Sequence, residues 1–238
     1  MKAFLLAAGY GKRLRPITYK TPKCLVPIND IPLIEYWFRL FRKYGIKDVL
    51  INSHYLPEKI NDYIRINVKD LKIKLKFEEK LLGSLGCILN NTDYISNEKS
   101  FLIFYSDNLT NFNINEFIFY HESHNLPVTV GLFHCLDPTL CGIASIDKDN
   151  TIIGFEEKPK NPKGNMANAG IYAFDRNVIN DLKFNNYDIL DISLHLLPKL
   201  IGQMKGFIIN DFIIDIGTIS NYKKAGDYIA LNPNMFGE

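Results

Sequence analysis

The residues with the clearest chemical potential lie near the start of the chain, in the stretch GYGKRLRPITYKTPK. Glycines directly after a strand let a ligand approach the backbone closely, and N–H groups in such a turn can hold phosphate oxygens. Arginine grips a polyphosphate with two parallel hydrogen bonds, and lysine adds a point charge. The pattern favours a phosphate-binding loop over a solvated basic turn. The stretch contains Gly9, Gly11 and the cations Lys12, Arg13, Arg15, Lys20 and Lys23, of which Arg13 and Lys23 are the expected phosphate ligands.

Two familiar phosphate-binding motifs do not fit this loop. A dinucleotide-binding fold has the pattern GxGxxG, and Leu14 stands here in the place of the third glycine. A Walker A loop has the pattern GxxxxGK followed by Ser or Thr, which the stretch also lacks. Hydride transfer with a dinucleotide and P-loop chemistry therefore lose their main support.

Two aspartates also stand where ligands collect. Asp107 follows the apolar run FLIFY, and Asp215 ends the run FIID. In parallel sheets, ligands bind at the carboxyl ends of the strands. An aspartate after a strand is equally a common turn former or helix cap, so position alone leaves both interpretations open.

The elements that must position these residues alternate in the first half of the chain. Buried strands read as apolar runs, and an amphipathic helix shows apolar residues at i, i+3, i+4 and i+7. Repeated strand and helix segments predict a parallel sheet with helices on both faces. We expect strands at 2–8, 47–52, 73–79 and 100–108, and helices at 31–44, 56–64, 83–91 and 114–124.

The second half is richer in strands, so the sheet is expected to be mixed but mainly parallel. The fold class is therefore α/β, Rossmann-like, with a sheet flanked by helices. A helical segment, a hairpin and a final helix from about Ile219 complete it. We expect strands at 127–135, 141–147, 151–159 and 168–174, helical structure at 187–201 and a hairpin at 206–217.

Composition bounds the class of protein. The chain has 238 residues, 28 basic and 26 acidic, and a net charge of +2, which indicates no nucleic-acid coat and no polybasic membrane binder. No linker divides it, so we expect one domain over 1–238, with halves at about 1–125 and 126–238. Scattered cysteines and the lack of a long apolar segment predict a cytoplasmic protein with no membrane partner.

The motifs together resemble a known family. LLAAGYGKRLRPIT followed by TPKCLVPI is similar to the signature of the sugar-1-phosphate nucleotidyltransferases, GxGxRLxPLT and then PKPLxPI. Asp107 and Asp215 match its GD and D-x-G-T positions, and the segments CGIASID, GFEEKP and NAGIYAF match its sugar-binding segments. The resemblance runs from Met1 to about Tyr228 and is closest to short mannose-1-phosphate guanylyltransferase-like proteins.

The resemblance implies a nucleotide-diphospho-sugar transferase fold without a C-terminal β-helix, and a reaction. A sugar 1-phosphate oxygen attacks the α-phosphorus of an NTP, with GTP favoured, and releases pyrophosphate with the help of Mg²⁺. The acceptor is of the mannose- or heptose-1-phosphate type. A homo-oligomer would be ordinary for such a protein.

The resemblance also assigns roles to residues. Catalytic roles fall to Arg13, Lys23 and Asp107, and metal binding to Asp107 and Asp215. The nucleotide-binding set is Leu6, Ala8, Gly9, Gly11, Arg13, Lys23 and Gly83, and the sugar-phosphate-binding set is Gly142, Glu157, Lys158 and Asn168.

The chain departs from the family pattern most sharply at Ser84 and Leu85, where threonine and alanine are usual. Cys24 and Ser106 are milder departures, for proline and glycine. The alternatives are uridylyl or thymidylyl transfer to another sugar 1-phosphate, and cytidylyl transfer to a non-sugar phosphate. A regulatory paralogue that only binds a sugar nucleotide is the non-enzyme alternative, although the charged residues needed for catalysis are all present.

The histidines and Cys24 receive simpler interpretations. The five histidines are far apart in sequence without metal-ligand spacing, and we expect His121 and His124 on a solvated helix face. Lys23 beside Cys24 could lower the pKa of the thiol, but a catalytic thiol is not expected.

Overall fold

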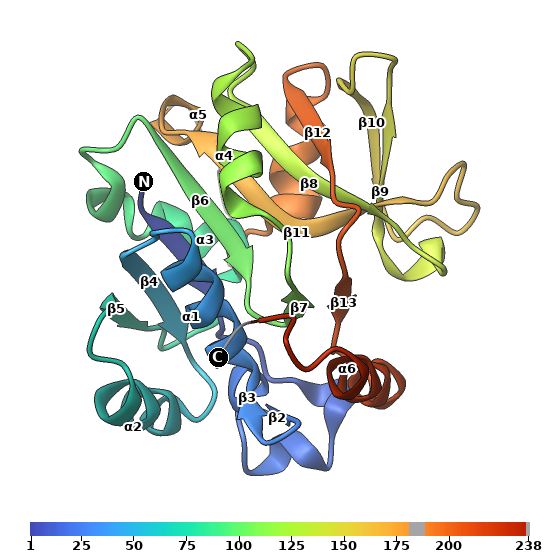
Figure 1. Ribbon diagram of the computed structural model, residues 1–238. Helices are drawn as coiled ribbons and strands as arrows, with labels where there is room; N and C mark the ends of the chain where they lie inside the picture. The colour runs from blue at the N-terminus through green and yellow to red at the C-terminus, as the bar shows by residue number, and fades with distance from the viewer. Residues whose placement is uncertain (181–188, 237–238) are drawn as a thin grey trace. The chain divides into compact units, whose positions relative to one another are not determined.

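The computed structural model describes residues 1–180 and 189–236 (Figure 1). Its contacts divide the chain into two compact units, each built from separate stretches. Unit 1 consists of Met1, Leu82–Ile103 and Asn115–Asn210, and unit 2 of Lys2–Leu81, Phe104–Ile114 and Asp211–Glu238. The expected single domain with halves near residue 125 stays a prediction, and each unit is described by itself.

Unit 2 begins with a parallel β-α arrangement. Strand β1 pairs with β4, and β4 pairs with β5, both in parallel register, so that Leu5 lies beside Ile51 and Ile51 beside Leu75. The elements of unit 2 are β1 (Ala3–Leu6), β2 (Pro27–Ile28), β3 (Ile31–Pro32), α1 (Leu33–Lys43), β4 (Asp48–Ser53), α2 (Pro57–Asn67), β5 (Lys72–Phe77), β7 (Asn108–Thr110), β13 (Ile213–Asp215) and α6 (Ile219–Leu231), with single helical turns at η1 (Lys12–Leu14), η2 (Ile17–Tyr19) and η3 (Lys23–Leu25).

Helix α1 has the apolar periodicity predicted for it. Its aromatic side chains are buried, and the Trp37 ring packs against Phe41 and Phe104 at centroid distances of 5.9 and 5.0 Å. The helix ends before Gly45, whose φ of +73° is a left-handed value that glycine adopts readily. Burial of this face therefore fixes the helix within unit 2.

Two short strands bring distant parts of the chain together in unit 2. Strand β13 pairs antiparallel with β7, so that Asp215 lies opposite Asn108. Leu109 and Ile216 are fully buried in one core cluster with residues of α6, among them Ala225. This apolar cluster holds the ends of β7 and β13 in place.

Unit 1 is a mixed sheet with short helices. Strand β11 pairs antiparallel with β8 and with β9, β9 pairs antiparallel with β10, and β12 pairs parallel with β8. The elements of unit 1 are α3 (Gly83–Leu89), η4 (Thr92–Ile95), β6 (Ser100–Tyr105, whose last two residues belong to unit 2), α4 (Ile114–Glu122), β8 (Val128–His134), η5 (Pro138–Leu140), β9 (Gly142–Ile146), β10 (Ile152–Glu157), β11 (Met166–Asp175), α5 (Asn177–Asn180), η6 (Ile192–Leu196), η7 (Leu197–Leu200) and β12 (Met204–Ile208).

The predicted fold class is confirmed: the chain is α/β with a mixed sheet flanked by helices. No β-helix occurs in the part of the chain that the structure describes. Across residues 1–180 and 189–236, no helix combines the length and apolar character that crossing a membrane requires.

The hairpin predicted at 206–217 is wrong. Strand β12 lies in parallel beside β8, whereas β13 lies antiparallel beside β7. The two apolar runs therefore find partners far away in sequence instead of each other. The helical segment predicted at 187–201 forms a π-helical turn at η6 and a 3₁₀ turn at η7, and residues 187–188 lie outside the described residues.

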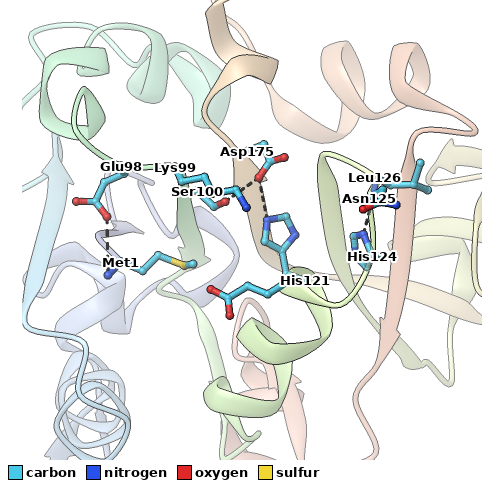
Figure 2. A pocket seen from close by; sticks show the side chains of 10 residues that line it. Met1, Glu98, Lys99, Ser100, His121, His124, Asn125, Leu126 and Asp175 are labelled. Atoms are coloured by element: carbon cyan, nitrogen blue, oxygen red, sulfur yellow. Dashed lines mark hydrogen bonds and ion pairs between the residues drawn. The ribbon is translucent and has the colours of Figure 1, made fainter.

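His121 does not lie on a solvated face, contrary to prediction. Its side chain is buried, with only 4% of the residue exposed, and it lines a cavity of about 460 Å³ together with His124, Ser100 and Asp175 (Figure 2). His121 Nε2 lies 3.4 Å from Asp175 Oδ1, to which Ser100 Oγ also donates a hydrogen bond. The apolar pattern of α4 does not reveal this polar contact.

The hydrogen bonds around these histidines can all be made by neutral rings. Leu126 N donates to His124 Nδ1 at 3.2 Å, so the proton of a neutral His124 lies on Nε2. His124 Nε2 and His121 Nδ1 each lie 2.8 Å from Thr129 Oγ1. The Thr129 hydroxyl can accept from His124 and donate to His121, which satisfies all three groups with both imidazoles neutral.

We expect acid to destabilise unit 1 through His121. Burial lowers the pKa of His121 despite Asp175 and Glu122, and Lys99 acts in the same direction as burial. An unfolded histidine binds a proton near pH 6.5, so the contribution is complete above that pH and is lost as the pH falls below it. The loss is at most about 1.4 kcal/mol per pH unit.

Urea denaturation at pH 7.5, 6.0 and 5.0 measures this effect as the fall in the free energy of unfolding. His121→Gln should flatten the fall, whatever its offset at pH 7.5. His134→Gln is the matched control, because His134 is exposed on the same unit. An unchanged pH dependence in His121→Gln would contradict the assignment.

Candidate active site

The glycine loop starts where β1 ends and is anchored at its first residue. Ala7 N donates to Asn52 Oδ1 at 2.7 Å, and Asn52 Nδ2 donates to Glu78 Oε1 at 2.7 Å. Both polar residues are buried, at 4% and 6% exposure; Asn52 lies near the end of β4, and Glu78 directly follows β5. On the other side, Leu6 O accepts from Ser106 N at 3.1 Å. The loop therefore leaves a rigid sheet edge in a fixed direction.

The two glycines of the loop serve different purposes. Gly9 is exposed, and a Cβ there would meet nothing within 4 Å, so its backbone is open to a ligand. Gly11 has a φ of +62°, and a Cβ would come within 2.9 Å of Thr18 and 3.3 Å of Lys23. The turn at Gly11 thus requires glycine, and it lets Lys23 pack closely. Ala8, which lies between the end of β1 and Gly9 in the chain, is buried.

Lys23 is the centre of the charged cluster. Its Nζ lies 2.7 Å from Asp107 Oδ2 and 3.0 Å from Asp215 Oδ1, and its side chain is only 12% exposed. Burial alone would lower the pKa of Lys23, but the two carboxylates more than offset this and the pKa is raised. The ammonium group therefore stays charged between two carboxylates.

The two aspartates meet because of the strand pair β7–β13. Asp107 lies in the turn before β7, and Ile216 N donates to Asp107 O at 3.0 Å. Partial burial, and next the negative charge of Asp107, raise the pKa of Asp215, while Lys23 and Arg13 act in the opposite direction. The two aspartates, which follow separate apolar runs in the sequence, thus lie against the same ammonium group.

Arg13 completes the cluster from η1. Its guanidinium Nη2 lies 3.6 Å from Asp215 Oδ2, and its side chain is 62% exposed. A Cβ on Gly217 would come within 2.7 Å of this nitrogen and 2.9 Å of the Asp215 carboxylate. A side chain at position 217 would therefore displace the ends of Arg13 and Asp215, and the Gly217 N–H donates to Asp215 Oδ1 at 2.7 Å. Thr218 then caps α6 by accepting from Asn221 N.

Cys24, next to Lys23, does not behave as an activated thiol. Burial raises the pKa of Cys24 to about 12, so the expected lowering by Lys23 is wrong. The side chain packs into the interior while Lys23 points to the carboxylates. Among the described residues, no three or more His, Cys, Asp or Glu side chains are arranged to hold a metal on their own.

In unit 1, the predicted sugar-phosphate residues lie on β9, β10 and β11. Gly142 pairs with Glu157, and a Cβ on Gly142 would come within 2.6 Å of Glu157 Oε2 and 2.7 Å of the Phe155 ring. Lys158 Nζ lies 3.5 Å from Glu157 Oε1 and is largely exposed. The backbone of Lys158 has a φ of +48°, an uncommon value for a residue other than glycine.

Asn168 lies at an irregularity in β11. The register with β8 shifts between Asn168 and Tyr172. Asn168 Oδ1 accepts from Gly170 N at 3.0 Å, and its Nδ2 donates to Tyr172 Oη at 2.7 Å and to Ser193 Oγ at 3.1 Å. The amide orientation is therefore fixed by its neighbours.

The Gly83–Ser84 turn, which starts α3, packs directly against Leu190 and Asp191. A Cβ on Gly83 would come within 2.3 Å of Leu190 O, and Ser84 Oγ donates to Asp191 Oδ2 at 2.9 Å. Leu85 is fully buried in the core. The sharpest departure from the family pattern therefore has a structural explanation within unit 1.

Sequence reasoning missed three residues that hold these groups in place. Asn52 and Glu78 anchor the glycine loop of unit 2, and Asp191 contacts the Ser84 turn of unit 1. None belongs to a motif, because each acts on a partner far away in sequence. The only available signal was a polar residue at the end of an apolar strand, as Asn52 is in VLIN.

Comparisons with known proteins identify the family of the chain. The family model described as Nucleotidyl transferase matches residues 2–230. The D-glycero-alpha-D-manno-heptose 1-phosphate guanylyltransferase of Campylobacter jejuni is 30% identical over 229 residues, which cover 93% of this chain and 97% of that protein. Other curated relatives, many of them named as mannose-1-phosphate guanylyltransferases, are longer, and the chain spans 52% to 63% of their length.

Solved structures share the fold. A Bacillus anthracis protein assigned as a glucose-1-phosphate thymidylyltransferase has a TM-score of 0.87 and 25% identity, with all of both chains covered. HddC from Yersinia pseudotuberculosis complexed with GMP-PN has a TM-score of 0.80 and 26% identity over 96% of this chain and 99% of that one. The predicted resemblance and enzyme class are confirmed. The chain belongs to the nucleotidyl transferase family, as an enzyme of the class that transfers a nucleotidyl group from an NTP to a sugar 1-phosphate.

Proposed function

We propose that the protein transfers a guanylyl group from GTP to a mannose- or heptose-type sugar 1-phosphate in a Mg²⁺-dependent reaction. The observation that carries the proposal is the cluster of Arg13, Lys23, Asp107 and Asp215 beyond the open backbone of Gly9. GTP is favoured because the curated relative that is 30% identical over nearly all of both chains is named as a guanylyltransferase. That protein's sugar, a heptose 1-phosphate, makes this the first acceptor to test.

The residues of the cluster fit a magnesium ion that is shared with a substrate. Mg²⁺ typically binds one or two carboxylates together with substrate phosphates and water. Asp107 and Asp215 already converge on one cation, the Lys23 ammonium, at 2.7 and 3.0 Å. When bound, Mg²⁺ would neutralise charge on the NTP phosphates, and Asp107 and Asp215 would hold it.

The chain's own residues account for the other steps. A sugar 1-phosphate oxygen forms a bond to the α-phosphorus, the bond from that phosphorus to the bridging oxygen breaks, and pyrophosphate leaves with the electron pair. No protein nucleophile is required, because the attacking oxygen is ionised at neutral pH. Arg13 and Lys23 stabilise the negative charge of the NTP phosphates. Lys158 binds the phosphate of the sugar 1-phosphate, and Glu157 accepts hydrogen bonds from the sugar hydroxyls. Alignment and charge neutralisation then supply the rate enhancement.

Pyrophosphate release tests the proposal directly. GTP, UTP, dTTP, CTP and ATP are each combined with mannose, heptose and glucose 1-phosphates and with phosphocholine in the presence of Mg²⁺. We expect release with GTP and a mannose- or heptose-type acceptor. Release with dTTP or UTP alone would overturn the base, release with phosphocholine alone would overturn the acceptor, and NTP binding without any release would favour a binding protein.

Metal binding has a test that does not depend on turnover. Water-proton relaxation reports Mn²⁺ bound to the protein in the presence of a non-hydrolysable GTP analogue. Asp107→Asn should weaken this binding by about tenfold or more. Asp211→Asn, which changes an exposed carboxylate in the segment before β13, is the matched control and should bind Mn²⁺ normally. Equal Mn²⁺ affinity in both variants would remove Asp107 from the metal site.

Arg13 and Glu157 should affect different kinetic constants. Arg13→Ala removes charge stabilisation during transfer and should lower kcat by about 100-fold. The control is Arg15→Ala, whose guanidinium stacks on Tyr19 at 5.0 Å. Steady-state kinetics with each substrate varied gives both constants, and an unchanged kcat in Arg13→Ala would contradict its role.

Glu157→Ala should mainly raise KM for the sugar 1-phosphate, by about tenfold, because a charged hydrogen-bond acceptor is lost. Glu156→Ala is its matched control, since Glu156 is the neighbouring exposed residue on the same strand. A rise in KM for the NTP instead would contradict the assignment of Glu157 to the sugar 1-phosphate.

A further inference from the structure

Asp191 has a carboxylate whose two oxygens hold two different segments of unit 1. Oδ2 accepts from Ser84 Oγ at 2.9 Å. Oδ1 accepts from Ser193 N at 2.8 Å and from Leu194 N at 3.2 Å, and so caps the π-helical turn η6. Charge-assisted hydrogen bonds of this kind are roughly twice as strong as neutral ones. One side chain therefore joins the start of α3 to the start of η6.

Backbone contacts strengthen the same junction. Leu190 O accepts from Leu85 N at 3.0 Å and from Gly86 N at 3.1 Å, and Leu190 N donates to Leu82 O at 2.8 Å. Ile192 N donates to Ser84 Oγ at 2.8 Å, so the hydroxyl both donates and accepts within the junction. The backbone of 190–192 is thus held on the Gly83–Ser84 turn.

The junction continues to a predicted sugar-binding residue. Ser193, which Asp191 holds through its N–H, places its Oγ 3.1 Å from Asn168 Nδ2. The second Nδ2 proton goes to Tyr172 Oη, and Oδ1 accepts from Gly170 N. Because Gly170 N is a donor, the Asn168 oxygen must face it, and the amide cannot flip. Asp191 therefore acts on Asn168 through one intermediate residue.

We propose that Asp191 is a positioning residue for the sugar 1-phosphate, which fixes the Asn168 amide so that its carbonyl oxygen offers a hydrogen-bond acceptor to a sugar hydroxyl. The inference rests on the proposed function in taking Asn168 as a sugar contact. A carbonyl oxygen has two acceptor positions, and among the described residues Gly170 N takes one of them at Asn168. Both Nδ2 protons are already donated, so Asn168 selects a hydroxyl that donates.

The charge of Asp191 also acts on Glu157, a second predicted sugar-phosphate residue. Burial raises the pKa of Glu157, Lys158 lowers it, and the negative charge of Asp191 raises it. An asparagine in place of this aspartate would keep the shape of the side chain but lose this charge. An Asp191→Asn variant should therefore move the acid limb of the pH profile for sugar-phosphate binding to lower pH, which a purely structural role would not do.

Steady-state kinetics on the full-length chain tests the proposal. Asp191→Ala and Ser84→Ala should raise KM for the sugar 1-phosphate about tenfold, or about 1.4 kcal/mol, and leave KM for the NTP within a factor of about two. Ser84→Thr keeps the hydroxyl and should have the same KM values as the wild-type protein. Ser123→Ala is the matched control, since its Oγ bonds only the Tyr120 carbonyl among the contacts described.

Each result bears on the proposal. A rise confined to the sugar 1-phosphate, rescue by Ser84→Thr and a shifted acid limb in Asp191→Asn support it. An equal rise for both substrates, or no rise in a folded Asp191→Ala protein, overturns it. If Asp191→Ala does not fold, Ser193→Ala removes the same link to Asn168 and must give the same selective rise.

Hydrogen exchange separates this inference from the proposed function. If the wild-type protein releases no pyrophosphate with any sugar 1-phosphate, the proposed function fails. The junction is then judged by amide exchange at Ser193 and Leu194, which should be at least about tenfold faster in Asp191→Ala than in Ser123→Ala. Equal exchange would overturn the positioning role, and a selective increase would preserve it without the assigned reaction.

Discussion

The charged cluster of unit 2 depends on one buried cation between two carboxylates. Two carboxylates repel each other, and the Lys23 ammonium, 2.7 Å from Asp107 and 3.0 Å from Asp215, offsets that repulsion. Taking such charges out of water costs more than their attraction returns unless the geometry is good and further hydrogen bonds are made. The strand pair β7–β13 and the N–H of Gly217 supply that geometry. The fold therefore holds charge in place before any substrate arrives.

A reaction between two anions requires this kind of preparation. Triphosphate and sugar phosphate repel each other, so the protein must present fixed cations whose orientation costs nothing at the moment of reaction. Arg13 is largely exposed and contacts Asp215 only at 3.6 Å, whereas Lys23 is held by two short contacts. The two cations are thus prepared differently: Lys23 is fixed by the fold, and Arg13 is free to change its partner.

The sequence predicted the parts that depend on local pattern. The apolar run of β1, the periodicity of α1 and the charged motifs around Arg13, Lys23, Asp107 and Asp215 are visible in single segments. It failed where the partner is distant. The runs of β12 and β13 looked like a hairpin, and only pairing with β8 and β7 separates them. His121 looked exposed because the cavity that it lines is completed by residues far away in the chain, among them Ser100 and Asp175.

The motif glycines carry information about side chains as much as about turns. A Cβ on Gly142 would strike the Glu157 carboxylate, and one on Gly217 would strike Arg13 and Asp215. At Gly11 the nearest side chain is Thr18, and the Cβ of Lys23 is next. In each case a residue with a predicted role leans against a backbone that carries no side chain. Gly142 and Gly217 therefore mark where charged groups lie close to the backbone, whereas Gly9 leaves its backbone open.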